Sequence, residues 1–284
     1  MKLLSYIFSL FLVVTFSTTV FGAGKGKIAY SVHNLSNYVP PELTNMSRFI
    51  MSSSEDQICV FCHTPHNGDQ NSPLWNKVMP TQQFYMYTSS MTLSNTAKKG
   101  NQPSTESLFC LSCHDGRTAI NVVHNVKNNP NTQTHGTNKT IDIGGTFNDN
   151  MNPLGYGYAL GGLGFADYGP NLGKQGSGAT TAESYFGSNL TDDHPISFSY
   201  LDAWNEKKNK LYDVATVSQR SNGKIRFFGP TKRIECSSCH DPHANYGADR
   251  MGNTWTAGGA DPTLRPFLVM DNSFSQLCTS CHIR

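Results

Sequence analysis

Long apolar runs and strong charge are both scarce in this chain of 284 residues. Only 37% of the residues are hydrophobic and only 15% are charged. Beyond the N-terminal region no segment is apolar enough to span a bilayer, and neither a long helical period nor a βαβ pattern is present. A nucleophile motif and a phosphate-binding loop are also missing, so no catalytic constellation of a familiar kind is evident.

No cysteine stands outside one repeated pattern. The chain has 8 cysteines, and each belongs to a Cys-x-x-Cys-His unit. The four units are Cys59/Cys62/His63, Cys110/Cys113/His114, Cys236/Cys239/His240 and Cys278/Cys281/His282. This is the attachment spacing of c-type haem, in which two cysteines on one face of a helical turn form thioethers to one porphyrin and the next His binds the iron. The sequence therefore predicts four covalently attached haem c groups with four proximal histidines.

Three other uses of paired cysteines explain the pattern less well. Zinc ribbons contain Cys-x-x-Cys units but give no reason for a His after each one. Disulfide frameworks belong to much shorter, loop-rich domains. Thioredoxin-like sites occur singly and beside a βαβ pattern, which this sequence lacks.

The N-terminal segment has the layout of a secretory signal peptide. Lys2 gives it a positive start, an apolar run follows from Leu3 to about Phe16, and small residues lie near a cut expected after Gly22. Residues 1–22 are therefore expected to be removed, which leaves 23–284 as a tetrahaem domain. Because c-type haem is attached outside the cytoplasm, the expected location is extracellular, at the outer cell surface, or periplasmic.

The remaining sequence is rich in Gly, Asn, Ser and Thr and poor in periodic patterns. Strand-like patterns occur at 27–32 and 224–228, and a helical pattern occurs at 46–54. Such side chains make a poor core, whereas four haems supply large apolar surfaces. The expected fold is a multihaem cytochrome c with irregular loops, short helices, low regular secondary structure and a core built around four haems. The negative charge of the propionates on four haems would exceed the formal net charge of +2 on the chain. The composition therefore gives no support for nucleic-acid binding.

Six further histidines are candidates for the second, distal iron ligands. They are His33, His66, His124, His135, His194 and His243. A two-part repeat, about 23–135 and 178–284 with a Gly/Asn-rich segment between, gives each half an upstream His, a CxxCHxPH motif and a CxSCH motif. This repeat selects as distal ligands His33, His66, His194 and His243. His124 stays an open alternative, and His135 is expected at the surface.

Prolines constrain two members of this distal set. Pro65 precedes His66 and Pro242 precedes His243, and a proline disfavours helical geometry in the residue before it. The attachment helix should therefore break after the proximal His. Each of these histidines lies on the proximal side of its own haem, so we expect it to reach the iron of a neighbouring haem.

Five stretches carry a resemblance to a known family. They are CVFCHTPHNGDQNSPLWN, SLFCLSCHDG, DDHPISFSY, IECSSCHDPH and FLVMDNSFSQLCTSCH. The chain resembles the exported multihaem c-type cytochromes with doubled CXXCH motifs, and within them the tetrahaem outer-surface nanowire cytochromes, over about 31–282. The resemblance implies electron transfer through four closely packed bis-His haems, with upstream redox cytochromes as partners. Because all four motifs keep their His and six further histidines are available for four irons, enzymatic catalysis is not expected. It also implies polymerisation into extracellular filaments in which a histidine of one subunit ligates a haem of the next.

The positions of two histidines favour head-to-tail assembly of identical subunits. His33 lies about ten residues after the expected mature start, and His282 lies two residues before the last residue printed. A repeated contact that does not close generates a filament. His33 is then expected to ligate the next subunit's haem held by Cys278 and Cys281. The alternatives are a soluble periplasmic tetrahaem carrier, in which His33 serves its own subunit, and a multihaem reductase with an open iron position.

Overall fold

A computed structural model of the chain describes ten segments. These are 25–43, 51–66, 68, 72–115, 120–126, 133–135, 138–141, 189–191, 193–248 and 253–284. The expected signal peptide, 1–22, lies outside them. Within the described segments no helix has the length and apolar character needed to cross a membrane.

Helices in the described segments are short. The α-helices are α1 (Lys25–Ala29), α2 (Asn95–Lys98), α3 (Thr105–His114), α5 (Tyr200–Glu206), α6 (Val214–Arg220), α7 (Cys236–Cys239) and α8 (Gln276–Cys281). Single 3-10 turns are η1 (Ile58–Phe61), η4 (Pro262–Leu264) and η5 (Ser273–Ser275). Side-chain caps begin several helices: Ser94 accepts the N–H of Ala97 at α2, and Asp213 accepts the N–H of Thr216 at α6.

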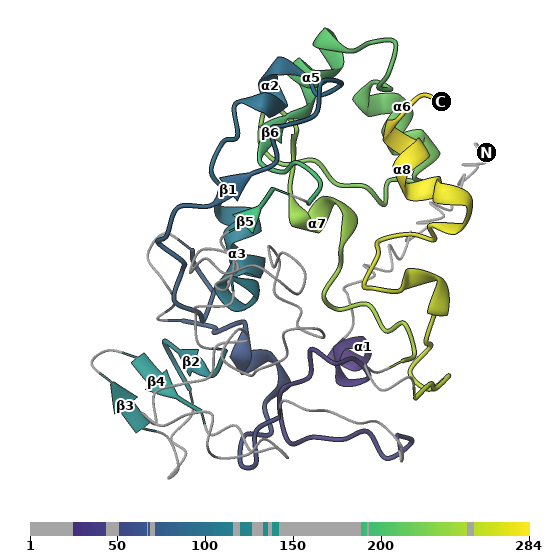
Figure 1. The fold of residues 1–284 in the computed structure, drawn as a ribbon. Coiled ribbons are helices and arrows are strands. Elements are labelled where there is room, and N and C mark those ends of the chain that lie inside the picture. The colour runs from purple at the N-terminus through teal and green to yellow at the C-terminus, as the bar shows by residue number, and fades with distance from the viewer. Residues whose placement is uncertain are drawn as a thin grey trace, which may run out of the picture.

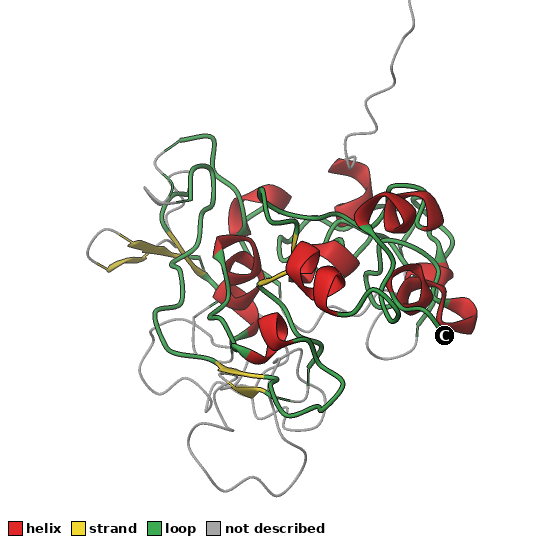
Figure 2. Cartoon of the chain, turned by 90° about the horizontal axis from the view of Figure 1, so that it is seen from above, coloured by secondary structure: helices red, strands yellow, loops and turns green. Residues whose placement is uncertain are grey.

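Strands in these segments are two or three residues long and pair across large sequence distances. They are β1 (Tyr85–Met86), β2 (Val122–Val123), β3 (Gln133–His135), β4 (Asn138–Thr140), β5 (Asn189–Leu190), β6 (Phe198–Ser199) and β7 (Arg233–Ile234). β1 pairs in parallel with β5, β6 pairs antiparallel with β7, and β2, β4 and β3 form an antiparallel sheet. Figure 2, viewed from above, shows these short strands scattered among helices and loops.

The two expected modules interlock. The largest apolar cluster combines Ala97 of α2 with residues of α5, α6, β6, β7 and α8, including Val217 and Leu277. A second cluster joins Phe84, Met86 and Leu111 of the first half to Leu190 of β5. In Figure 1, α2 accordingly lies beside α5 and β6, and α7 lies next to α3. Packing thus fixes the first half of the chain against the second.

The sequence-based elements differ from the structure in three places. The strand expected at 27–32 is wrong, because residues 25–29 form α1 and its backbone continues in a turn from Tyr30 N–H to the carbonyl of Lys27. At 224–228 no strand forms, and only Phe228 makes an isolated bridge to Arg233. Of the helix expected at 46–54, residues 51–54 are described, and they are not helical.

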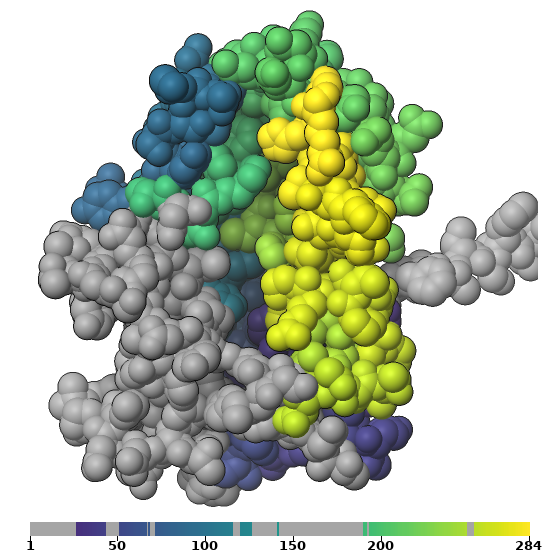
Figure 3. All heavy atoms as spheres, turned by 45° about the vertical axis from the view of Figure 1, so that its right-hand side comes forward, coloured from purple at the N-terminus to yellow at the C-terminus, as the bar shows by residue number. Residues whose placement is uncertain are grey.

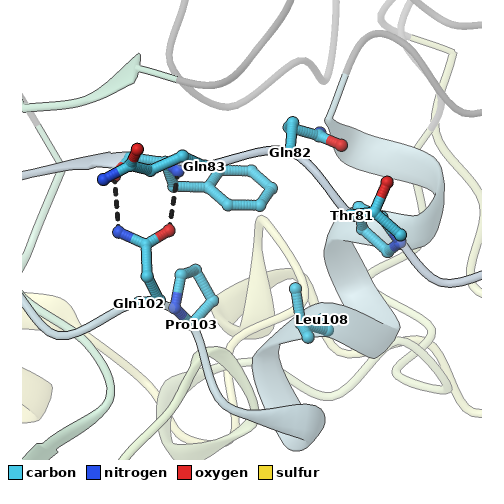
Figure 4. A pocket seen from close by; sticks show the side chains of 8 residues that line it. Thr81, Gln82, Gln83, Gln102, Pro103 and Leu108 are labelled. Carbon is cyan, nitrogen blue, oxygen red and sulfur yellow. Dashed lines mark hydrogen bonds between the residues drawn. The ribbon is translucent and has the colours of Figure 1, made fainter.

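A furrow runs along one face of the molecule beside the C-terminal segment. Figure 3 shows that segment in yellow as a column along one wall, with green and teal atoms at the floor. A separate shallow pocket of about 340 Å³ lies next to α3 and is lined in part by Phe84, Gln102 and Leu108. There the amide of Gln102 bonds both the N–H and the carbonyl of Phe84, at 2.7 and 2.8 Å (Figure 4). The pocket lining contains no residue of the four cysteine motifs.

Candidate haem-binding site

Each cysteine motif lies on one helical turn. α3 contains the whole of Cys110–His114, and α7 and α8 each end at the second cysteine of their motif. In the other three motifs the N–H of the histidine donates to the carbonyl of the first cysteine. The distances are 2.7 Å for His63 to Cys59, 3.0 Å for His240 to Cys236 and 2.9 Å for His282 to Cys278. This turn puts the two sulfurs on one side, as attachment to a single porphyrin requires.

All eight cysteines are described, and each is a free thiol. Cys59 and Cys278 are exposed, and the other six are partly buried. The sulfurs are therefore available for thioether bonds at each of the four turns.

The first two motifs lie side by side in space. Burial and, to a smaller extent, the nearby Cys113 raise the pKa of the Cys62 thiol to about 12. Both groups lie around Lys77, whose ammonium donates to the carbonyl of Val122 at 2.9 Å. Haems attached at these two turns would be neighbours.

The second, third and fourth motifs continue the row. The thiols of Cys110 of α3 and Cys236 of α7 are close neighbours, and their interaction raises the pKa of Cys110 and lowers that of Cys236. Burial and, to a smaller extent, the adjacent Cys278 of α8 raise the pKa of Cys239 to about 11. The spatial order of the four attachment turns is thus the same as their order in the sequence.

Three proximal histidines each face a second imidazole. The ring centroids of His114 and His33 are 6.0 Å apart, and those of His63 and His243 are 6.4 Å apart. The centroids of His282 and His194 are also 6.4 Å apart. The structure thereby brings three of the four expected distal histidines to the motifs.

These separations fit an iron between the rings. Two imidazoles bound to one metal from opposite sides, each by a bond of about 2 Å, have centroids about 6 Å apart. The interplanar angles of 89°, 15° and 72° do not decide the fit, since each ring can rotate about its metal–nitrogen axis. Among the described residues no group of three or more His, Cys, Asp and Glu is arranged around a bare metal ion. A haem iron, in contrast, takes only two protein ligands.

Hydrogen bonds leave Nε2 as the nitrogen that can bind a metal. His33 Nδ1 lies 3.1 Å from the carbonyl oxygen of Pro242, and His194 Nδ1 lies 2.8 Å from that of Pro195. A carbonyl oxygen only accepts, so in the neutral ring Nδ1 carries the proton and Nε2 has the free lone pair. Metal-binding histidines usually have this arrangement, which fixes the tautomer and the ring orientation.

Two further histidines repeat the arrangement. His243 Nδ1 lies 2.9 Å from Oδ1 of Asp241, and His240 Nδ1 lies 3.1 Å from the carbonyl oxygen of Pro266. The carboxylate partner of His243 is a stronger acceptor than a backbone carbonyl. Asp241 is a functional residue that was not expected from the sequence, although its place between the two histidines of CHDPH is a visible signal.

Partial desolvation lowers the pKa of four of the paired imidazoles. Burial and, to a smaller extent, the nearby His114 lower the pKa of His33 to about 4. The pKa values of His63, His194 and His282 are also lowered, in each case mainly by burial. Neutral imidazole is the form that binds a metal, so these rings are in the ligating state at neutral pH.

His124 is poorly suited to ligate an iron through Nε2. That atom lies 3.0 Å from the carbonyl oxygen of Lys77, so Nε2 carries the proton in the neutral ring. The alternative that the sequence left open for His124 is therefore disfavoured. His135 belongs to β3, and its side chain lies outside the described part of the structure.

His33 is not where the filament hypothesis expected it. The expectation was a bond to the haem held by Cys278 and Cys281 of the next subunit, but the structure pairs His33 with His114 of its own chain. The ring is fixed there by its hydrogen bond to Pro242 and by Phe267, whose ring centroid is 4.2 Å away. These contacts come from the second half of the same chain and explain the difference.

His66 and His240 are left without such a pair among the side chains that the structure describes. His66 is exposed, and its Nδ1 lies 3.5 Å from the amide nitrogen of Asn125. His240 is also exposed, with Nδ1 held by Pro266 and Nε2 directed to no described imidazole at the spacing of the other pairs. One expected distal ligand and one proximal ligand therefore stay unmatched within the described chain.

Comparisons with known proteins do not name a family. No protein-family model matches the chain, and no curated protein is significantly similar to it. The four motifs and the three imidazole pairs therefore carry the functional assignment.

Proposed function

We propose that the protein is an exported electron-transfer protein that binds four c-type haems, and that it is the subunit of an extracellular filament. The observation that carries the proposal is the set of three imidazole pairs, 6.0 to 6.4 Å apart, each joining a proximal histidine to a histidine predicted as distal. When bound, each haem iron supplies a one-electron ferric/ferrous couple.

Residues of the chain would attach the porphyrin, ligate the iron and orient the ligating imidazoles. The two cysteines of each turn would hold the porphyrin covalently, and the two imidazoles of each pair would bind its iron. Hydrogen bonds on Nδ1 of His33, His194 and His243 hold these rings in one orientation in both oxidation states. Because the ligand set does not change, little reorganisation accompanies the gain or loss of an electron.

Continued by one more step, the pairing pattern within the chain would link one subunit to the next. His33 and His194 each face the second motif of their own half, whereas His243 of the second half faces His63 of the first half. His243 thus pairs with the first motif of the half that precedes its own. If His66 pairs in the same way, it binds the iron held by His240 in the preceding subunit. A relation of this kind does not close within one chain, and repeated contacts that do not close form filaments.

In this assignment the ligand shared between subunits is His66 and not His33. The partner is still an identical subunit bound head to tail. Identical subunits would share one iron–imidazole bond at each contact, and upstream redox cytochromes would deliver electrons to one end of the row. The location consistent with this role is the outer surface of the cell, after export by the N-terminal segment. A soluble periplasmic carrier remains the alternative if His66 binds no iron of another subunit.

A multihaem reductase is the second candidate, and His240 is the observation that favours it. Without a second imidazole, the iron at His240 would have an exchangeable position, which reductases of small oxyanions need. The two functions differ in one property: a filament of bis-His haems binds no added ligand, whereas a reductase binds carbon monoxide at one reduced haem of four.

The test uses the haem-loaded protein and two matched variants, His66→Ala and His124→Ala. Electron microscopy of the wild type should show filaments, and the reduced filaments should bind no carbon monoxide. His66→Ala should give short oligomers that bind one carbon monoxide per chain, and His124→Ala should behave as the wild type. Filaments of His66→Ala with four intact bis-His spectra would exclude His66 as the shared ligand. Carbon monoxide binding by intact wild-type filaments, with turnover of a small oxyanion, would favour the reductase.

A further inference from the structure

A fully buried carboxylate lies between the second and third cysteine motifs. The side chain of Glu235 is 0% exposed and directly precedes Cys236. Its Oε2 accepts hydrogen bonds from the hydroxyls of Ser107, at 2.6 Å, and Ser197, at 2.7 Å. Its Oε1 accepts from Nε of Arg233 at 2.8 Å. The burial of a carboxylate is costly unless such donors compensate it, and here three donors do so, one from α3, one from β7 and one from the residue before β6.

The same group connects the two attachment helices. Ser107 belongs to α3, and its Oγ also accepts the N–H of Cys236 in α7 at 3.2 Å. Glu235 is the N-cap residue of α7, where its N–H donates to Oγ of Ser238 at 2.9 Å. The thiols of Cys110 and Cys236, which influence each other's pKa, lie at this junction. Glu235 therefore fixes the distance between the second and third attachment turns.

The charges at this junction do not cancel. Arg233 is the one described cation bonded to the cluster, and it contacts two carboxylates, Glu235 at 2.8 Å and Glu106 at 3.0 Å. One positive and two negative charges leave a net charge of −1. The side chains of Arg233 and Glu106 are 27% and 31% exposed, so water screens them, whereas the Glu235 carboxylate has no such screening.

We propose that Glu235 is a positioning residue that sets the redox potentials of the second and third haems. This inference rests on the proposed function, because it requires haems at Cys110/Cys113 and Cys236/Cys239. A buried negative charge favours the ferric form over the ferrous form, because ferric haem carries one more positive charge. The haems on either side of Glu235 are therefore expected to have lower potentials than they would without it.

The test compares the haem-resolved potentials of three purified, haem-loaded proteins: wild type, Glu235→Gln and Glu106→Gln. Glutamine keeps the shape and accepts the two serine hydroxyls, but it removes the buried charge. Glu235→Gln should lower the ferric/ferrous ratio at fixed potential at least about fivefold at two of the four haems, a rise of about 40 mV at 59 mV per tenfold. Glu106→Gln should change the ratio less than about twofold, since that carboxylate is partly solvated. Glu235→Asp should restore both potentials.

Two results would overturn the inference: all four potentials unchanged in Glu235→Gln, or all four shifted equally. If Glu235→Gln does not fold and bind its haems, Arg233→Gln tests the same electrostatic effect. It removes a positive charge from the cluster, so the expected shift in potential has the opposite sign. Removal of the cation should lower the potentials of the same two haems, and unchanged potentials would overturn the inference. The haem content of each sample separates the hypotheses, because a wild-type protein without four haems contradicts the proposed function itself.

Discussion

Removal of His33 tests the assignment of ligands within one subunit. His33→Ala deletes one ring of the pair that spans 6.0 Å to His114 and leaves that side of the iron open. His243 lies nearby, but its ring already faces His63 at 6.4 Å. No other described imidazole lies in position to replace His33. The change should therefore affect one haem of four, the one attached at Cys110 and Cys113.

The assay is a carbon monoxide titration of the reduced, haem-loaded variant. His33→Ala should bind one more carbon monoxide per chain than the wild type, and one quarter of the low-spin haem signal should convert to a five-coordinate spectrum. His33→Met should instead keep six ligands and raise the potential of the same quarter, because a methionine ligand raises haem potentials. His124→Ala is the matched control, since the Nε2 of His124 is bonded to Lys77. The reasoning fails if His33→Ala binds no additional carbon monoxide, or if His124→Ala does.

Three further predictions follow from the packing and the charges. Leu111→Ala should lower the free energy of unfolding by about 2–5 kcal/mol in denaturant titrations, because the side chain is 0% exposed within α3. Asp241→Asn should raise the potential of a single haem in spectroelectrochemistry, because His243 loses a carboxylate partner and becomes a weaker donor. The pKa of Glu106 is lowered: burial opposes the shift, but hydrogen bonds and the charge of Arg233 outweigh it. The resulting stabilisation is present above about pH 4.5 and is lost as the pH falls through the lowered pKa, so Glu106→Gln should flatten the acid side of the stability curve.

The attachment turns were predictable because the residues within each motif determine the local backbone structure. A Cys-x-x-Cys-His string specifies both the spacing and the turn, and α3 and α8 show that turn in different surroundings. Pro242 was predicted to end the attachment helix, and α7 does end at Cys239. However, α8 ends at the equivalent Cys281 with no proline after it, so the proline is not required for the break.

The pairing of histidines with irons was not predictable, because it depends on how distant segments meet. The repeat selected His33 and His243, but nothing local connects His243 with His63 at the other end of the chain. Short apolar patterns were also ambiguous: a strand was expected at 27–32, yet Ile28 and Ala29 lie in the short helix α1, where both are buried. The buried Glu235 gave no signal beyond its place before a cysteine, because its burial comes from residues of α3 and β7.

The mass of the mature, purified protein tests the central claim most directly. The account predicts the mass of the chain from about Ala23 plus four haem groups, with all eight thiols consumed as thioethers. Peptide mapping should assign one haem to each of the four Cys-x-x-Cys-His turns. A mass that corresponds to disulfides, to bound zinc or to fewer than four haems would contradict the account.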